Sequence, residues 1–227
     1  SDGSWERYTY DSAGRTLKTI RPFLDAPPST ADEALCRVTE NIFGPIADAD
    51  GDGLPETRTT TIERTLGQET ARRYRIDWSA ATILGGDACR RRSEIVCVTA
   101  GAAWDAAANL VTDTLTYALG KFKDRERRVV HPDGTAVLTI HVLAADGQLI
   151  TTVKSGRPNT ARDDIVDGRR TVTVTSSTGQ VTTESVTDVA SNLLLTSWAA
   201  TVFDSLGRPT RLDFFDGTYV TRNYACC

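Results

Sequence analysis

The sequence predicts an all-β fold of consecutive antiparallel β-hairpins that form an elongated or curled sheet with a loop-rich insertion. The chain of 227 residues contains 33 threonines, and this β-branched residue suits the solvent-facing side of a strand. Polar and apolar residues alternate in runs such as Thr171–Thr175, which is the period of a strand. Most of the 17 glycines stand in short clusters typical of turns. Together these features predict many short strands joined by tight turns.

Charge and hydropathy narrow the classes of partner. The chain has 26 Lys and Arg against 30 Asp and Glu, for a net charge of -4. Nucleic acids and membrane surfaces favour a basic protein face, so neither is expected as a partner. No apolar run approaches the roughly 20 residues of a membrane helix, so no membrane insertion is expected. Met is absent even at position 1, which indicates a processed or excised part of a longer protein.

A short repeat recurs along the chain. Residues 10–15 read Tyr-Asp-Ser-Ala-Gly-Arg, and residues 203–208 read Phe-Asp-Ser-Leu-Gly-Arg. The Asp side chain can accept from the backbone two residues on, and Gly allows a positive φ, so each copy predicts a hairpin turn. Weaker copies stand at 104–109, 143–148, 175–180 and 187–192, and a second turn type, Asp-Gly-Thr, ends the segments 132–135 and 215–218.

These repeats resemble the YD-repeat, or RHS-repeat, family. The stretch 202–224 is similar to the family pattern, with Phe203–Arg208 followed by a Phe-Asp-Gly-Thr-Tyr turn and Asn223-Tyr224. The stretch 5–23 is similar as well. Family members are typically large exported or surface proteins whose repeats wind into a β-sheet spiral. The resemblance therefore implies a secreted or cell-surface location, with the remainder of a larger parent chain as the partner.

The repeats divide the chain into three segments. Residues 1–24 are expected to form a first YD-like hairpin, and residues 101–227 a series of degenerate ones. Residues 25–100 show almost none of the pattern and are expected to form an irregular insertion that holds a calcium loop and cysteines. Within it, a short helix is expected over 31–40 with Thr30 as its N-cap.

The segment 48–56 carries a calcium-loop pattern. Acids alternate at its start, Gly53 takes the sixth position, and an acid takes the ninth. Ca²⁺ prefers six to eight hard oxygen ligands, which a tightly coiled loop of alternating acids can supply. The alternative is an exposed acidic turn without metal. The predicted ligands are Asp48, Asp50, Asp52, Glu56 and the carbonyl oxygen of Leu54.

The five cysteines leave at least one thiol unpaired within the chain. No pair has the Cys-x-x-Cys spacing of a zinc site. One interpretation is a set of ordinary buried or terminal thiols. The other is a disulfide between Cys89 and Cys97 across a hairpin, with Arg90, Arg91 and Arg92 at its tip.

The same three arginines and Trp78 are the candidate ligand contacts. Arginines at a hairpin tip are either simply solvated or contact a polyanion or sugar acid. Trp78 and Trp104 are either core residues or platforms on which a sugar stacks.

The sequence contains few features typical of a catalytic site. His131 precedes a Pro-Asp-Gly turn and His141 lies in an alternating strand, and neither is accompanied by a nucleophile elbow. We therefore expect a non-catalytic structural module of a large exported YD-repeat protein, stabilised by one Ca²⁺. The alternatives are a carbohydrate- or cell-surface-binding module and an enzyme with an unrecognised site.

Overall fold

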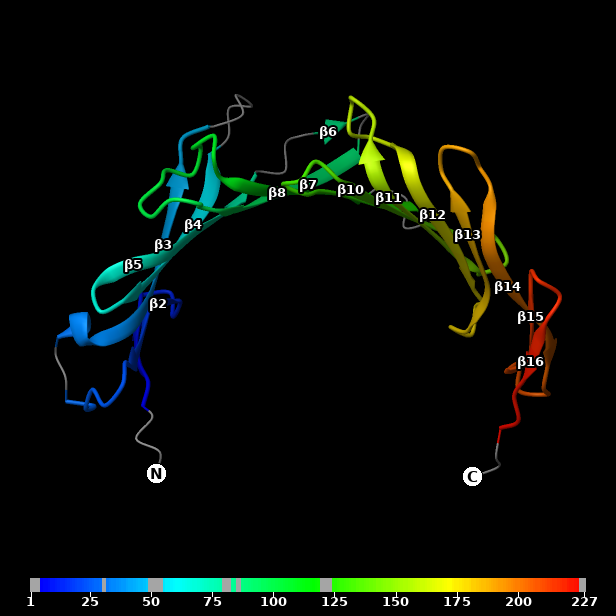
Figure 1. Cartoon of the computed structure of the whole chain (residues 1–227), viewed down its shortest axis with the longest axis horizontal. Coiled ribbons are helices and arrows are strands. Elements are labelled where there is room, and N and C mark those ends of the chain that lie inside the picture. Colours follow the sequence, from blue (N-terminus) through cyan, green and yellow to red (C-terminus); the bar gives the residue numbers. More distant parts are fainter. Residues whose placement is uncertain are drawn as a thin grey trace. The chain divides into compact units, whose positions relative to one another are not determined.

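The chain folds as an all-β protein, as predicted (Figure 1). The computed structural model describes residues 5–29, 32–48, 55–78, 83–84, 87–118 and 124–224. Fifteen strands follow one another in chain order in one antiparallel sheet, with β1 and β16 as the terminal strands, and the short strand β6 pairs with β7. Within the described ranges there is no α-helix, and hence none long and apolar enough to cross a membrane.

The strands are between two and eleven residues long. They are β1 (Arg7–Tyr10), β2 (Thr16–Pro22), β3 (Cys36–Ile46), β4 (Glu56–Thr65), β5 (Gln68–Asp77), β6 (Ile83–Leu84), β7 (Asp87–Val96), β8 (Leu110–Ala118), β9 (Asp124–Val130), β10 (Ala136–Leu143), β11 (Leu149–Pro158), β12 (Ile165–Thr175), β13 (Val181–Asp188), β14 (Leu194–Phe203), β15 (Pro209–Phe214) and β16 (Tyr219–Thr221).

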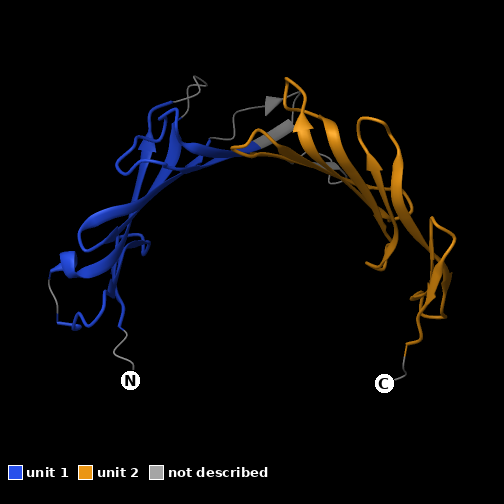
Figure 2. Ribbon diagram, viewed as in Figure 1, with its two compact units in different colours: residues 1–82, 90–113 blue, residues 83–89, 114–227 orange. Residues whose placement is uncertain are grey.

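The chain divides into two compact units (Figure 2). Unit 1 comprises residues 1–82 and 90–113, and unit 2 comprises residues 83–89 and 114–227. These boundaries differ from the three segments expected from the sequence. Residues 25–100 are not an irregular insertion, because they supply the long strands β3, β4, β5 and β7 to the same meander.

Thr30 and Ala31 lie outside the described residues, and over residues 32–40 the expected helix does not form. Only a single 3₁₀ turn, η1 (Glu33–Leu35), is present; the Asp32 side chain caps it by accepting from the backbone of Ala34 at 2.9 Å. From Cys36 onward the chain is β3, in which Cys36 and Val38 are buried at alternate positions. Pairing with β2 joins Val38 to Ile20, so packing across the sheet overrides the local helix signal.

The two strongest repeat copies form the same hairpin turn. In the first, Asp11 Oδ1 accepts from the backbone N–H groups of Ala13 and Arg15, both at 2.9 Å. In the second, Asp204 Oδ1 accepts from Leu206 and Arg208 at the same distances. The arginine of each copy also bonds the other Asp oxygen at 2.7 Å. The glycines have φ of 76° and 73°, as the pattern predicts.

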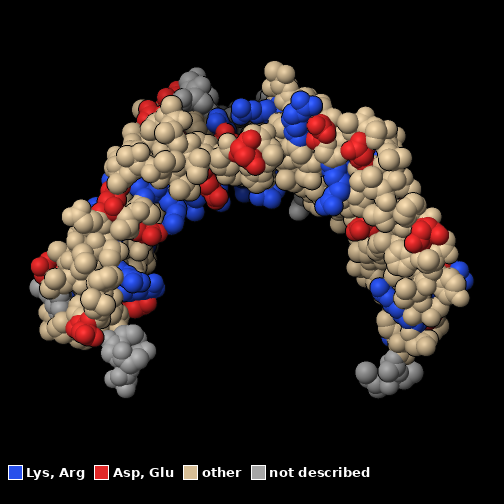
Figure 3. All heavy atoms as spheres, viewed as in Figure 1, with Lys and Arg blue, Asp and Glu red and all other residues tan. Residues whose placement is uncertain are grey.

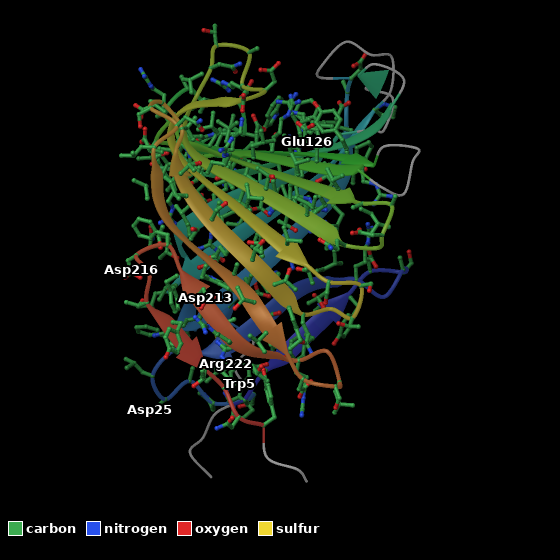
Figure 4. The ribbon with its side chains drawn as sticks, turned by 90° about the vertical axis from the view of Figure 1, so that its right-hand side faces the viewer. Trp5, Asp25, Glu126, Asp213, Asp216 and Arg222 are labelled. Atoms are coloured by element: carbon green, nitrogen blue, oxygen red, sulfur yellow. The ribbon has the colours of Figure 1, made fainter. Side chains whose placement is uncertain are left out.

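The second turn type is equally regular. Asp133 accepts from both the backbone N–H and the hydroxyl of Thr135, at 2.9 and 2.8 Å. Asp216 likewise accepts from the backbone N–H and the hydroxyl of Thr218, at 2.9 and 2.7 Å. Figure 4 shows Asp216 in the turn that follows β15, which carries Asp213. The weaker repeat copies also coincide with connections between strands, such as 143–148 between β10 and β11.

The β4–β5 hairpin uses a turn that the sequence pattern does not predict. Thr65 pairs with Gln68, so only Leu66 and Gly67 form the loop, with φ of 53° and 75°. Positive φ at both loop residues matches the right-handed twist of the flanking strands. Asn or Asp usually precedes Gly in such turns, and Leu gives no comparable signal.

Each unit has its own hydrophobic clusters. In unit 1, Ile20, Cys36 and Val38 form one cluster, and Tyr74, Ile76 and Ile95 form another. In unit 2, the buried residues Ala136, Leu138 and Ile165 pack together. Fully burying an aliphatic side chain such as Ile76 contributes about 1.5–3 kcal/mol, so these clusters anchor strands whose remaining side chains are mostly half-buried.

Two glycines face each other across β11 and β12. Gly156 pairs with Gly168, and their φ values are 145° and 136°. A Cβ added at Gly156 would lie 2.1 Å from the Asp167 carbonyl oxygen and 2.8 Å from Gly168 Cα. The backbones thus approach so closely that only glycine fits.

Substitution of Gly156 should therefore be costly. We expect Gly156→Ala to lower the free energy of unfolding by about 3 kcal/mol, from backbone overlap together with a strained φ. Gly44→Ala in β3 is the matched control, because an added Cβ there meets nothing within 4 Å. Urea unfolding followed by circular dichroism measures both, and equal losses for the two variants would contradict this account.

The turn aspartates should make stability fall in acid. Hydrogen bonds from the Arg15 and Arg208 backbone hold the pKa values of Asp11 and Asp204 below their ordinary range. A carboxyl whose pKa is lowered by folding stabilises the protein above its unfolded pKa, about 3.9 for Asp. We expect the melting temperature to be constant from pH 7 to 5 and to drop as pH falls below about 4 and through the lowered folded values.

The control is the double variant Asp11→Asn/Asp204→Asn, which keeps two acceptors that cannot titrate. Its melting temperature should fall less between pH 5 and pH 2 than that of the unmodified chain. Superimposable acid profiles of the two proteins would show that these turns do not contribute.

Candidate binding pocket

A cavity of about 430 Å³ opens within unit 1. Its walls come from β5, β7, the start of β8 and the segment that connects β7 to β8. Polar and aromatic side chains line it together. The residues on which its chemistry depends are Trp78, Arg91, Ser93, Trp104, Asp105 and Asp113.

Strand alternation brings these side chains to one face. Ile76 on β5 pairs with Ser93 on β7, and the backbone N–H of Trp78 donates to the Arg91 carbonyl at 3.0 Å. Ile76, Trp78, Arg91 and Ser93 thus point to the pocket side, because alternate residues of paired strands share a face.

A chain of polar contacts connects four of the residues that line the pocket. The Trp78 indole N–H donates to Ser93 Oγ at 2.9 Å, and the Ser93 hydroxyl in turn donates to Asp113. The Arg91 guanidinium lies 3.6 Å from Asp113 and stacks 4.2 Å from the centre of the Trp78 ring. Ser93 is only 3% exposed, so its buried hydroxyl holds the Asp113 carboxylate in place. Asp113 also lines the cavity, so part of the carboxylate faces it.

The segment that carries Trp104 is tied to β5. Glu69 accepts from the Gly101 backbone at 2.6 Å, and the buried Tyr74 hydroxyl donates to the Ala102 carbonyl at 2.7 Å. A hydrogen bond from Arg72 keeps the pKa of Glu69 below its usual range. The Asn109 amide donates to the carbonyls of Ala103 and Trp104, which closes the segment on itself.

The three arginines do not form a hairpin tip, because all of them lie inside β7. Only Arg91 lines the pocket. Arg92 is exposed and pairs with Asp77 at 2.6 Å, and Arg90 is exposed as well. On the face that Figure 3 shows, acidic and basic side chains are interspersed in each unit. Of the two alternatives, solvation fits Arg90 and Arg92, which are exposed, whereas Arg91 lines the pocket.

The predicted Cys89–Cys97 hairpin is wrong. Cys89 lies in β7 and Cys97 directly follows the end of that strand, so the two do not lie on facing strands. Eight residues of strand span about 26 Å, whereas a disulfide needs Cα atoms within about 7 Å. Cys97 is a free thiol near the Ala102 carbonyl, and burial raises its pKa.

The predicted calcium loop lies between β3 and β4, where Ile46 pairs with Glu56. Asp50, Asp52 and Leu54 lie outside the described residues. Of the two described candidates, Asp48 is exposed and Glu56, the first residue of β4, is 1% exposed. Within the described ranges, no three His, Cys, Asp or Glu side chains form a group that could hold a metal.

Comparisons with known proteins add no further constraint: no family model, curated protein or solved structure matches the chain. The sequence pattern points to Trp78, Trp104 and Arg91 as candidate contacts but gives no signal for Ser93 and Asp113. A polar residue in a strand has the same sequence pattern whether it faces solvent or a pocket. The neighbouring strand determines which of the two it faces. Strand β8 follows a long connection, and the sequence does not reveal the register in which it pairs.

The buried serine generates a prediction. Ser93→Ala should lower the free energy of unfolding by about 1–3 kcal/mol, because it removes a partner from both the Trp78 indole and Asp113. Arg92→Gln on the same strand breaks only an exposed ion pair and should cost less than about 1 kcal/mol. Urea unfolding compares the two, and an equal or larger loss for Arg92→Gln would refute the network's importance.

Proposed function

We propose that this chain is a non-catalytic structural module of a larger exported protein built from YD-like hairpin repeats. One observation carries the proposal: the turns at Asp11 and Asp204 have the same side-chain hydrogen bonds. The two turns stand near opposite ends of the sequence. Such conserved turn chemistry within one chain is typical of repeat architectures, in which each unit pairs with its neighbours.

The remainder of the parent chain is the proposed partner. A terminal strand of an antiparallel sheet presents a row of backbone donors and acceptors along its outer edge. Among the described strands, β1 and β16 each have one neighbour in the sheet order, so further hairpins could pair with either. The exposed aromatic side chains of Tyr8 and Tyr10 on β1 and Tyr219 on β16 suit such pairing.

One Ca²⁺ is proposed to stabilise the β3–β4 loop. The sequence places alternating acids in this loop, and the buried Glu56 stands at its base in β4. Asp48, Asp50, Asp52, Glu56 and the Leu54 carbonyl would bind the ion. Neutralising several carboxylates and ordering the loop would couple binding to folding.

Thermal melts in calcium and in chelator test this role. At a free calcium concentration one hundredfold above Kd, binding adds about 2.7 kcal/mol to the free energy of unfolding. For a chain of this length, that raises the melting temperature by roughly 5–11 °C. Asp50→Ala should abolish the difference between the two conditions.

Asp146→Asn, in the β10–β11 turn of unit 2, is the matched control and should retain the full calcium shift. Identical melting temperatures of the unmodified chain in calcium and chelator, with no heat of binding by calorimetry, would remove calcium from the proposal.

A second function, carbohydrate binding, is favoured by the unit 1 pocket. Its combination of aromatic walls and a few fixed polar groups is common in small-ligand sites. Two carboxylates, Asp105 and Asp113, also line the cavity, so hydrolysis is the competing chemistry. Asp113 is engaged by Arg91 and Ser93, and Asp105 is exposed, an arrangement that suits holding a hydroxyl-rich ligand.

A further inference from the structure

We propose that the unit 1 pocket binds a neutral saccharide through two adjacent hydroxyl groups, one on Asp113 and one on Arg91. This inference rests on the carbohydrate binding proposed above and specifies the residues and the ligand class. It also changes the role expected for the arginines. Instead of three contacts for a sugar acid, one arginine, Arg91, contacts a neutral sugar together with Asp113.

The Asp113–Arg91 pair offers complementary hydrogen-bonding groups. The carboxylate only accepts and the guanidinium only donates. A hydroxyl group does both, so neighbouring hydroxyls on a sugar ring can donate to Asp113 and accept from Arg91. The 3.6 Å between the two side chains lets one rigid diol reach both. An isolated hydroxyl would use only half of this arrangement.

The pocket charges favour an uncharged ligand. Among the lining side chains, Arg91 is opposed by Asp113 and accompanied by Asp105, so one positive charge stands with two negative charges. A uronate or sulfate group would have to compete with Asp113 for Arg91 and would approach a second carboxylate. Arg92 offers no compensation, because it is paired with Asp77, which is not among the lining residues.

The aromatic contact comes from Trp104. The Trp78 ring already carries the Arg91 guanidinium at 4.2 Å and serves to hold that side chain. Trp104 lines the same cavity from the segment fastened to β5 by Glu69 and Tyr74. An aromatic ring beside fixed polar groups suits the mixed apolar and hydroxylated surface of a pyranose.

The polar groups are held in place before a ligand arrives. Ser93 fixes Asp113, and Trp78 fixes both Ser93 and Arg91. Such preorganisation reduces the entropy cost of binding. The Asn109 side chain is used by the connecting segment itself: its Nδ2 bonds two carbonyls and its Oδ1 is buried, so it shapes the wall.

The experiment begins with an array of neutral and acidic oligosaccharides probed with the full chain. Hits are then titrated by calorimetry and by tryptophan fluorescence, with tetragalacturonic acid and a heparin tetrasaccharide as anionic probes. We expect neutral oligosaccharides to bind at least tenfold more tightly than the anionic ones. Asp113→Asn should weaken that binding about tenfold or more, as for loss of a hydrogen bond to a charged group.

Arg92→Gln is the matched control, since it changes a neighbouring arginine outside the pocket, and it should leave Kd unchanged. Melting temperatures of both variants show whether they fold. Tighter binding of the anionic probes would overturn the neutral-ligand inference while leaving carbohydrate binding intact. Binding that Asp113→Asn does not weaken would place the site elsewhere and also overturn the inference.

Two further outcomes concern the proposed functions themselves. Failure of every oligosaccharide to bind would reject carbohydrate binding and this inference together, without affecting the calcium test of the structural role. Shortening of an oligosaccharide during the titration would replace binding with catalysis and reject the non-catalytic proposal.

Discussion

The register of each hairpin is the constraint on which the rest of this structure depends. In a sheet whose strands follow chain order, the backbone donors and acceptors of each inner strand bond to the strands directly before and after it. A slip of one residue would turn each buried side chain to the opposite face. The turns prevent this, because an aspartate such as Asp11 or Asp204 accepts from two backbone N–H groups in only one alignment. Short polar turns therefore determine which side chains become core and which become surface.

That dependence explains what could be predicted from the sequence. The strand-and-turn class and the turns at Asp133 and Asp216 follow from local chemistry, since an Asp and a Gly at fixed spacing specify both acceptor and φ. Strands β3 and β4 were not anticipated, because the turn at Leu66-Gly67 lacks a polar signal and the segment near Cys36 has local helix features. There, pairing between strands decided the outcome, and a single sequence does not encode pairing explicitly.

The pocket was predicted in part for the same reason. Three arginines in a row suggested one charged surface, but alternation along β7 assigns Arg91 to the pocket side and leaves Arg92 to a separate ion pair. Trp78 and Arg91 could be named without knowing that they touch. Ser93 and Asp113 acquire their importance only when β8 takes its place beside β7. The chemistry of the site thus results from which strands are neighbours more than from any motif.

The order of the strands also governs how the protein can unfold. Contacts between strands join segments that are close in sequence, and chains rich in such local contacts close short loops early in folding. Among the strands that the structure describes, none pairs with a strand distant in the sequence, so loss of a terminal hairpin leaves the next ladder of hydrogen bonds in place. Unfolding can therefore proceed hairpin by hairpin, as in repeat proteins whose stability is a sum over neighbouring units. For the same reason, such a chain can gain or lose a hairpin during evolution while the remaining hairpins keep their pairing.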